Sequence, residues 1–196
     1  MDKHNRTMII FLYGRDTYRS RKKLNEIIAR YREVHKSGMS FHVFDREDAS
    51  FGDFCNAAEA ATMFSEKRFI VLTQCLASKD FCQNFMAWKG RENAASAQDI
   101  IYIFREENID KKGDAQRWLI KNAKSQEFEI LTGVNLHKWA KKFVNDKGIK
   151  ISQGALFQLL SITEGDLWAL ENELLKLKLY AEGEISDKDL AVFFDS

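Results

Sequence analysis

The stretch that decides the fold is Ala57-Ala-Glu-Ala-Ala-Thr-Met-Phe-Ser-Glu-Lys-Arg-Phe-Ile-Val-Leu72. Its first residues, up to Ala61, have the composition of a helix end, and Phe69 to Leu72 form an apolar, partly β-branched strand. Between the two, the apolar pair Met63-Phe64 is followed by a charged step. Large apolar side chains at a helix-to-strand corner either fold back into the core or stand out as a wedge for a partner. The pattern alone leaves both interpretations open.

Strand-like runs recur along the first two thirds of the chain, and helical patterns lie between them. Several of these runs are almost continuously apolar, which is typical of strands that are buried on both faces of a sheet. Strands that alternate with helices form a parallel sheet with right-handed crossovers and with helices on both faces. The predicted strands are Met8–Tyr13, Ser40–Phe44, Phe69–Thr73, Ile100–Phe104 and Phe128–Leu131.

Helices are predicted between these strands. Asp48 or Ser50 can cap a helix that runs towards Ala61. Two further helices are expected near residues 81–88 and 115–123. The helix after the first strand has one apolar face, which consists of Leu24, Ile27, Ile28, Tyr31 and Val34.

The pattern changes after about Gly133, where strands stop and amphipathic helices follow one another. Gly148, Gly165 and Gly183 separate these helices as helix ends or turns. We therefore expect an α/β domain at 1–132 and a small helical lid domain at 133–196. The helices of the second domain are predicted at Asn135–Asp146, Gln153–Thr163, Gly165–Ala181 and Ser186–Phe194.

Composition limits the function classes. The 196 residues are 45% hydrophobic and 30% charged, which indicates a globular protein and excludes a disordered chain. A formal net charge of +1 argues against a nucleic-acid binder with a basic surface all round. No run approaches the ~18 apolar residues of a membrane span, so a cytoplasmic protein without membrane contact is expected. Cys55, Cys75 and Cys82 lack the spacing of a metal site and are expected to be buried small hydrophobes.

The turn after the first strand is where a parallel sheet of this kind binds phosphate. A phosphate-binding loop reads G-x-x-x-x-G-K-[ST], because its glycines let backbone N–H groups reach the phosphates and its Lys reaches the terminal one. Here Gly14 follows the strand, but Arg19 occupies the position of the second Gly and Ser20 that of the Lys. A bulky Arg at a tight turn, without the Lys, predicts a degenerate nucleotide site.

Other chemical motifs are weak as well. The strand at Ile100–Phe104 is followed by Arg105 and by the pair Glu106-Glu107. Two carboxylates can hold Mg²⁺ beside a nucleotide, but without a phosphate loop we interpret the pair as a solvated corner. The four histidines are scattered, and none lies beside a nucleophile in a strand-turn-helix elbow. The sequence therefore predicts no catalytic residue, no metal site and no cofactor.

Basic residues gather on the first long helix. Arg19, Lys22 and Lys23 are the candidates for a DNA contact, since Lys and Arg neutralise phosphates. Charged residues opposite an apolar helix face are more often solvated, and this second interpretation stays open.

A phosphate-binding fold without its phosphate residues, followed by a helical lid, resembles the delta subunit of the bacterial DNA polymerase III clamp loader. This family is AAA+-type but does not bind ATP itself. The order and the spacing of the matching stretches carry the resemblance over most of the chain. These stretches are Phe11–Tyr18, Phe44–Ser50, Met63–Leu72, Asn108–Lys112 and Gly165–Leu177.

The resemblance implies an AAA+/P-loop-NTPase-like fold and a role in DNA replication. A delta subunit binds and opens the ring-shaped sliding clamp (the beta subunit) within the DNA polymerase III holoenzyme, and it has no enzymatic activity by itself. Its other partners are the remaining clamp-loader subunits, and DNA is contacted only weakly or indirectly. By position, the residues that bind the clamp are Ala61, Thr62, Met63, Phe64 and Ser65.

The chain departs from the family pattern at several points. Ala61 stands where a longer apolar residue is common, and Trp168 stands where ATP-using relatives carry a sensing Arg. The sequence stops at Ser196, after the second domain, so the C-terminal collar domain of the family and collar assembly are not expected for it. Two alternatives remain outside the resemblance. One is a degenerate P-loop enzyme that uses Glu106 and Glu107 for Mg²⁺, and the other is a DNA-binding accessory protein that uses the basic helix.

Overall fold

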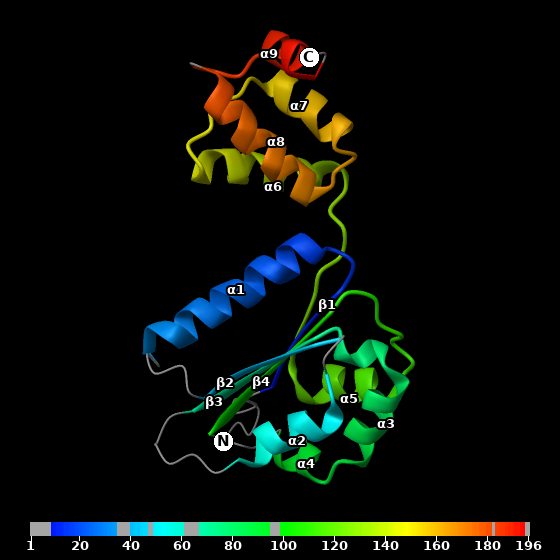
Figure 1. Cartoon of the computed structure of the whole chain (residues 1–196). Coiled ribbons are helices and arrows are strands. Elements are labelled where there is room, and N and C mark those ends of the chain that lie inside the picture. The colour runs from blue at the N-terminus through cyan, green and yellow to red at the C-terminus, as the bar shows by residue number, and fades with distance from the viewer. Residues whose placement is uncertain are drawn as a thin grey trace, which may run out of the picture. The chain divides into compact units, whose positions relative to one another are not determined.

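The computed structural model describes residues 9–34, 40–46, 49–60, 67–94, 99–181 and 183–194. They form two compact units, with the division between Glu129 and Ile130. The first unit combines strands and helices, and the second is built from helices (Figure 1).

The first unit contains a five-stranded sheet. Its strands are β1 (Ile9–Tyr13), β2 (Phe41–Asp45), β3 (Arg68–Thr73), β4 (Ile100–Glu106) and β5 (Lys124–Glu127). They are ordered β2-β3-β4-β1-β5, and every neighbouring pair is parallel. Tyr13 lies opposite Glu106, so the carboxyl end of β4 stands next to the turn that follows β1. The predicted five-stranded parallel sheet is confirmed.

The position of the fifth strand was predicted wrongly. The apolar residues at 128–131 suggested a strand, whereas β5 occupies Lys124–Glu127 and all four of its residues are exposed. It lies at the edge of the sheet beside β1, where main-chain hydrogen bonds suffice and both faces need not be buried. Phe128 is buried, but it follows the strand instead of opening it.

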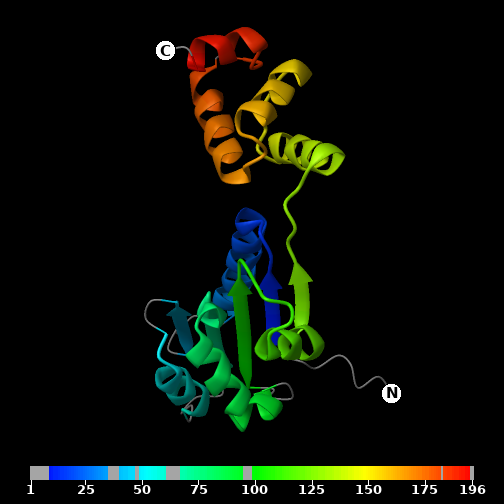
Figure 2. The same cartoon turned by 90° about the vertical axis from the view of Figure 1, so that its right-hand side faces the viewer.

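Helices cover both faces of the sheet (Figure 2). Helix α1 (Thr17–Val34) packs on one face, where Leu24 and Tyr31 meet Val71 and Ile103. Val34 is 74% exposed, so the predicted apolar face stops before the last residue of α1, where the helix no longer meets this core. The opposite face is covered by α2 (Phe51–Glu59), the 3₁₀ turn η1 (Cys75–Ala77), α3 (Lys79–Ala87), α4 (Gly90–Ala94) and α5 (Asp114–Asn122).

Local capping explains where helix α2 begins. The Ser50 hydroxyl oxygen accepts a hydrogen bond from the Asp53 N–H at 3.4 Å, as an N-cap residue does. The predicted alternative cap, Asp48, lies outside the described residues. The helix ends at Glu59, and Ala60 follows as its C-cap.

The second unit is a small helical bundle, as predicted from the amphipathic segments after Gly133. Leu167, Leu170, Leu174 and Leu177 are all buried along one side of a single helix. Trp168 of the same helix, by contrast, is 42% exposed. The helices are α6 (Gly133–Asp146), α7 (Gln153–Ile162), α8 (Leu167–Tyr180) and α9 (Asp187–Phe194).

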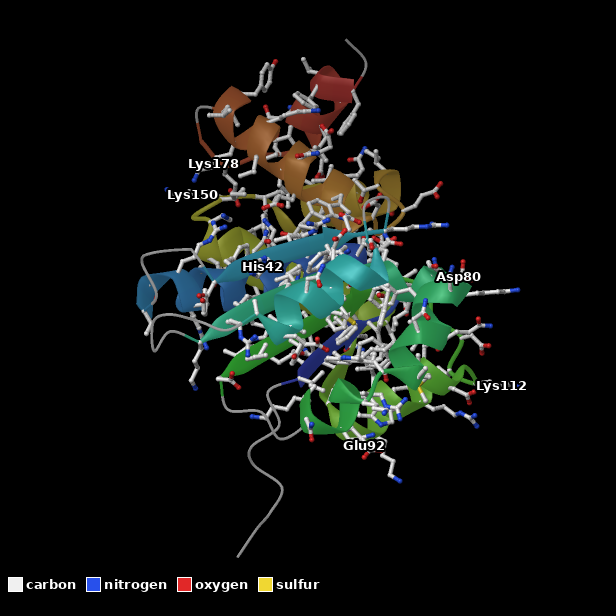
Figure 3. All side chains as sticks on the ribbon, turned by 60° about the horizontal axis from the view of Figure 1, so that its bottom comes forward. His42, Asp80, Glu92, Lys112, Lys150 and Lys178 are labelled. Atoms are coloured by element: carbon white, nitrogen blue, oxygen red, sulfur yellow. The ribbon has the colours of Figure 1, made fainter. Side chains whose placement is uncertain are left out.

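Charged side chains lie on the outside of both units. Asp80, Glu92 and Lys112 are exposed on the first unit, and Lys150 and Lys178 on the second (Figure 3). None of the described helices is both long enough and apolar enough to span a bilayer.

Candidate functional site

The candidate site is the turn between β1 and α1, at the carboxyl edge of the sheet. Gly14 adopts φ +124°, a conformation that L side chains rarely adopt. A Cβ at this position would lie 2.4 Å from the Phe128 carbonyl oxygen. The Gly14 N–H donates to the Glu106 carbonyl oxygen at 3.1 Å, and the Asp16 N–H donates to the Phe128 carbonyl oxygen at 3.0 Å. The turn is therefore packed closely against the segment that follows β5.

A carboxylate of the chain itself occupies the amino terminus of α1. Asp16 is 6% exposed, and its Oδ1 accepts a hydrogen bond from the Arg19 N–H at 2.8 Å. Its Oδ2 accepts from the Arg19 Nε at 2.6 Å. The Arg19 guanidinium also donates to the Glu129 carbonyl oxygen and lies over the Phe128 ring, 5.9 Å from its centroid.

This arrangement disfavours a bound phosphate at the turn. In a phosphate-binding loop, the free N–H groups and the positive dipole end of the helix attract an anion. Here the Asp16 carboxylate already meets an N–H group of the first turn and a guanidinium. Ser20, at the position of the phosphate-binding Lys, is fully buried and donates to the Thr17 carbonyl oxygen at 3.2 Å. The structure thus brings the predicted residues Gly14, Arg19 and Ser20 together as a turn that satisfies its own polar groups.

A buried arginine stands beside this turn. Arg105 is 2% exposed, and its Nη2 donates to the Thr17 carbonyl oxygen at 3.4 Å and to Glu107 Oε1 at 3.2 Å. Its Nε and Nη1 find no acceptor among the described residues. Burial and the nearby Arg21 lower the pKa of the Arg105 guanidinium. Arg105 therefore adds a buried cation to the first turn of α1.

The neighbouring Glu106 belongs to the other face of the sheet, because successive strand residues point to opposite faces. It is 2% exposed, and its Oε1 accepts a hydrogen bond from the Leu76 N–H of η1 at 3.1 Å. Burial raises the pKa of the Glu106 carboxyl to about 8, so it is mostly protonated at neutral pH. The expected solvated corner is therefore wrong for Glu106.

Glu106 and Glu107 do not converge on one cation site. Glu106 caps η1, whereas Glu107 forms an ion pair with Arg105 on the face that α1 covers. Among the described residues, no group of three His, Cys, Asp or Glu side chains could hold a metal ion. The geometry of these two carboxylates therefore disfavours the alternative of a Mg²⁺-dependent enzyme.

The basic residues proposed to contact DNA are partly engaged within α1. Lys23 forms an ion pair with Glu26 at 3.0 Å. The Lys22 Nζ lies over the Tyr18 ring, 5.1 Å from its centroid. With Arg19 held by Asp16, these contacts favour the solvated-face interpretation over a continuous DNA-binding stripe.

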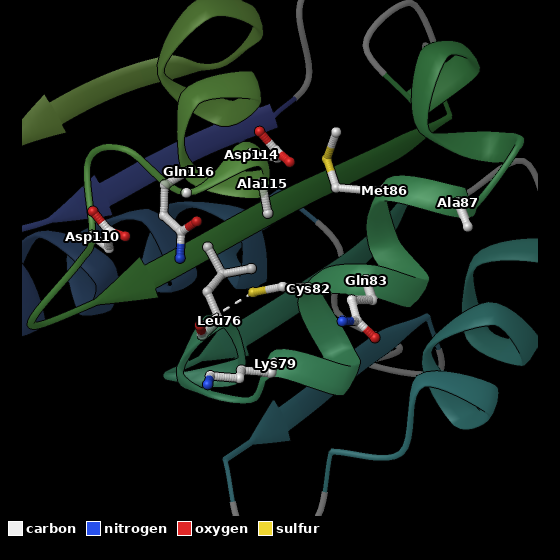
Figure 4. Close-up of a pocket in the computed structure, with 11 residues that line it drawn as sticks. Leu76, Lys79, Cys82, Gln83, Met86, Ala87, Asp110, Asp114, Ala115 and Gln116 are labelled. Atoms are coloured by element: carbon white, nitrogen blue, oxygen red, sulfur yellow. Dashed lines mark hydrogen bonds between the residues drawn. The ribbon is translucent and has the colours of Figure 1, made fainter.

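A separate groove of about 620 Å³ opens between α3 and α5 (Figure 4). Leu76, Cys82, Met86 and Ala115 give it an apolar lining, and Asp110 lies at one end. The Cys82 thiol donates to the Leu76 carbonyl oxygen at 3.2 Å, and burial raises its pKa, so it is a packed thiol rather than a nucleophile. The groove leaves no local pattern in the sequence, because its walls come from helices that are separated in the chain.

The predicted clamp-binding residues Ala61, Thr62, Met63, Phe64 and Ser65 lie outside the described residues. The segments on both sides are described. Ala60 is the C-cap of α2, and Lys67 immediately precedes β3.

The strand order and the parallel pairing define the class of this fold, which is an α/β fold of the P-loop-NTPase-like type, with a helical unit after the α/β unit. No protein-family model matches the sequence, and no curated protein matches it.

Two solved structures share the fold. One is the Bacillus subtilis DNA clamp loader delta protein YqeN, with a TM-score of 0.56 and 18% identity over 97% of this chain and 59% of that one. The other is a RuvB mutant from Thermotoga maritima, with a TM-score of 0.61 and 12% identity over 95% of this chain and 61% of that one. The chain thus spans about three fifths of the length of each.

Proposed function

We propose that this chain is a clamp-binding module of the clamp-loader delta type, which binds the sliding clamp and does not hydrolyse ATP itself. The observation that carries the proposal is the Asp16 carboxylate at the amino terminus of α1, the position where a phosphate-binding loop would hold its anion. The structural likeness to the Bacillus subtilis clamp loader delta protein supports the choice of partner.

The proposed contact residues are Ala61, Thr62, Met63, Phe64 and Ser65, with Met63 and Phe64 as the anchors. Burial of one Met or Phe side chain contributes about 1.5–3 kcal/mol, so the pair contributes about 3–6 kcal/mol. A micromolar complex requires about 8 kcal/mol. Two anchors and a modest polar rim therefore account for binding in this range.

The proposed mechanism is mechanical. A protein that binds the open-interface state of a ring more tightly than the closed state shifts the population towards the open state, by no more than the difference between the two affinities. In this proposal the domain at 1–132 carries the clamp contact and the domain at 133–196 is its lid. The other loader subunits supply ATP hydrolysis, and DNA is contacted only weakly or indirectly.

Calorimetry with the sliding clamp encoded by the same genome tests the proposal. We expect micromolar or tighter binding of the wild-type chain and loss of at least tenfold in affinity when Met63 and Phe64 are both replaced by Ala. The matched control replaces Phe157 and Leu179 by Ala, since these two apolar side chains are 64% and 89% exposed on the helical unit. Equal affinity of the wild type and the Met63/Phe64 variant, or equal loss in the control, contradicts the proposed contact.

A further inference from the structure

Ala60 and Lys67 are the nearest described residues on either side of the proposed clamp-binding segment. The main chain of each is held by a hydrogen bond from a side chain. Arg68, the first residue of β3, is 9% exposed and turns its guanidinium to the end of α2. Its Nη1 donates to the Ala58 carbonyl oxygen at 2.7 Å and to the Ala60 carbonyl oxygen at 2.5 Å. Its Nη2 forms an ion pair with Asp99 Oδ2 at 2.7 Å. One side chain thus bonds two carbonyl groups at a helix end and a carboxylate beside the next strand.

A second bond holds the other flank. The Tyr31 hydroxyl of α1 donates to the Lys67 carbonyl oxygen at 2.7 Å. The Tyr31 ring packs against the Phe69 ring, with 4.3 Å between their centroids. The main chain at Lys67 is therefore tied to the face of the sheet that α1 covers, while Ala60 is tied to Arg68.

The Arg68 contacts join the start of β3 to the end of α2. Arg68 comes eight residues after Ala60, and its own guanidinium bonds the Ala60 carbonyl oxygen. Holding the ends of a segment removes conformational entropy that binding would otherwise have to remove. A planar guanidinium can bond Ala58, Ala60 and Asp99 together, whereas the point charge of a Lys cannot reproduce this fork.

We infer that Arg68 is a positioning residue for clamp binding: it fixes the end of α2 and thereby the point from which the segment with Met63 and Phe64 departs. This inference rests on the proposed function. Arg68 acts through Ala60 and makes no contact with the clamp itself in this scheme. We attribute the positioning role to the bonds that Arg68 donates to the two carbonyl groups. Its ion pair with Asp99 contributes less, because the Asp99 side chain is 65% exposed and solvent screens the interaction.

The test is a double-mutant cycle measured by clamp binding. Arg68→Lys is expected to weaken binding about tenfold in the wild-type background, and by less than about threefold in a Met63→Ala background, since coupled residues give non-additive effects. Asp99→Ala is the matched control. It removes the ion pair but leaves the carbonyl bonds, and its expected effect on affinity is less than about twofold.

Hydrogen exchange of the chain without the clamp gives a second readout, at the end of α2. The Ala60 N–H donates to the Asn56 carbonyl oxygen at 2.9 Å, and its hydrogen exchange should accelerate about tenfold in Arg68→Lys, while exchange at Leu72 in the middle of the sheet stays unchanged. Unchanged clamp affinity in Arg68→Lys, or equal losses in the two backgrounds, overturns the inference. If the wild-type chain does not bind the clamp, the proposed function fails and the inference fails with it. If the wild-type chain binds the clamp but Arg68→Lys shows no coupling to Met63→Ala, the positioning role is refuted and the proposed function stands.

Discussion

Replacement of Glu106 by Gln should stabilise the α/β unit at alkaline pH. Glu106 is buried beneath η1 and accepts a hydrogen bond from the Leu76 N–H. Its pKa is raised by burial from the ordinary value of 4.5 to about 8. The folded chain therefore holds a proton that the unfolded chain releases between these two pH values. As a result, stability falls as pH rises from about 4.5 to 8, and the loss is complete above pH 8.

The size of the effect follows from the same two values. Each pH unit between the unfolded and the folded pKa corresponds to 1.36 kcal/mol, so a pKa raised from 4.5 to about 8 implies a loss of about 5 kcal/mol. This figure is an upper value for the loss of unfolding free energy, because water that enters beside the charged carboxylate reduces the cost of ionisation. Glutamine keeps an oxygen that can accept from the Leu76 N–H, and it does not titrate.

The measurement is urea unfolding of the wild type and Glu106→Gln at several pH values from 5 to 9. The difference in unfolding free energy between the two proteins isolates Glu106, since all other titrating groups are shared. We expect the variant to gain stability relative to the wild type as pH rises, by several kcal/mol between pH 5 and pH 9. A difference that stays constant over this range would refute the argument that Glu106 is buried and protonated.

Other substitutions test the turn and the helical bundle. Gly14→Ala should cost at least about 2 kcal/mol in unfolding free energy, because φ is +124° and a Cβ would meet backbone, whereas Gly183→Ala in open space should be neutral within about 0.5 kcal/mol. Asp16→Ala should lower the unfolding free energy by about 1–2 kcal/mol, because the hydrogen bond from the Arg19 N–H in the first turn of α1 is removed. An unchanged unfolding free energy in urea would contradict the capping role of Asp16. Leu174→Ala should cost about 2–5 kcal/mol through the cavity that it leaves, and a similar cost for the half-exposed Leu175→Ala would contradict this account of the bundle core.

The interior strands were predictable from the sequence, but the edge strand β5 was not. Strands β1, β3 and β4 lie between neighbours and under helices, so most of their residues are apolar and buried. β5 is an exposed edge strand of the sequence Lys-Ser-Gln-Glu, and its main-chain pairing with β1 leaves no hydrophobic pattern. The apolar residues after it misled the prediction, because Phe128 is buried against the turn after β1 and not within a strand.

At the candidate site, the sequence predicted only that a phosphate-binding loop is missing. The residues at Gly14, Arg19 and Ser20 showed that no phosphate-binding loop is present, but they did not show what takes its place. The pair Glu106-Glu107 was interpreted as a solvated corner, because such residues are rarely buried. Arg105 and Glu106 are nevertheless both 2% exposed. Their burial depends on the register that places Tyr13 opposite Glu106, and a register between distant strands is not written in local sequence patterns.

The topology separates the turn after β1 from the end of α2, which the proposed clamp-binding segment follows in the sequence. β1 ends at Tyr13, next to Asp16, whereas β3 begins at Arg68, and parallel strands place these two points at opposite edges of the sheet. A strand of five or six residues separates the edges by about 16–20 Å. A substitution at Asp16 is therefore expected to leave the end of α2, and the bonds of Arg68 to the Ala58 and Ala60 carbonyl oxygens, undisturbed. It follows that Asp16→Ala should lower the stability of the chain while clamp affinity stays within about twofold of the wild type, because substitutions at distant sites act independently.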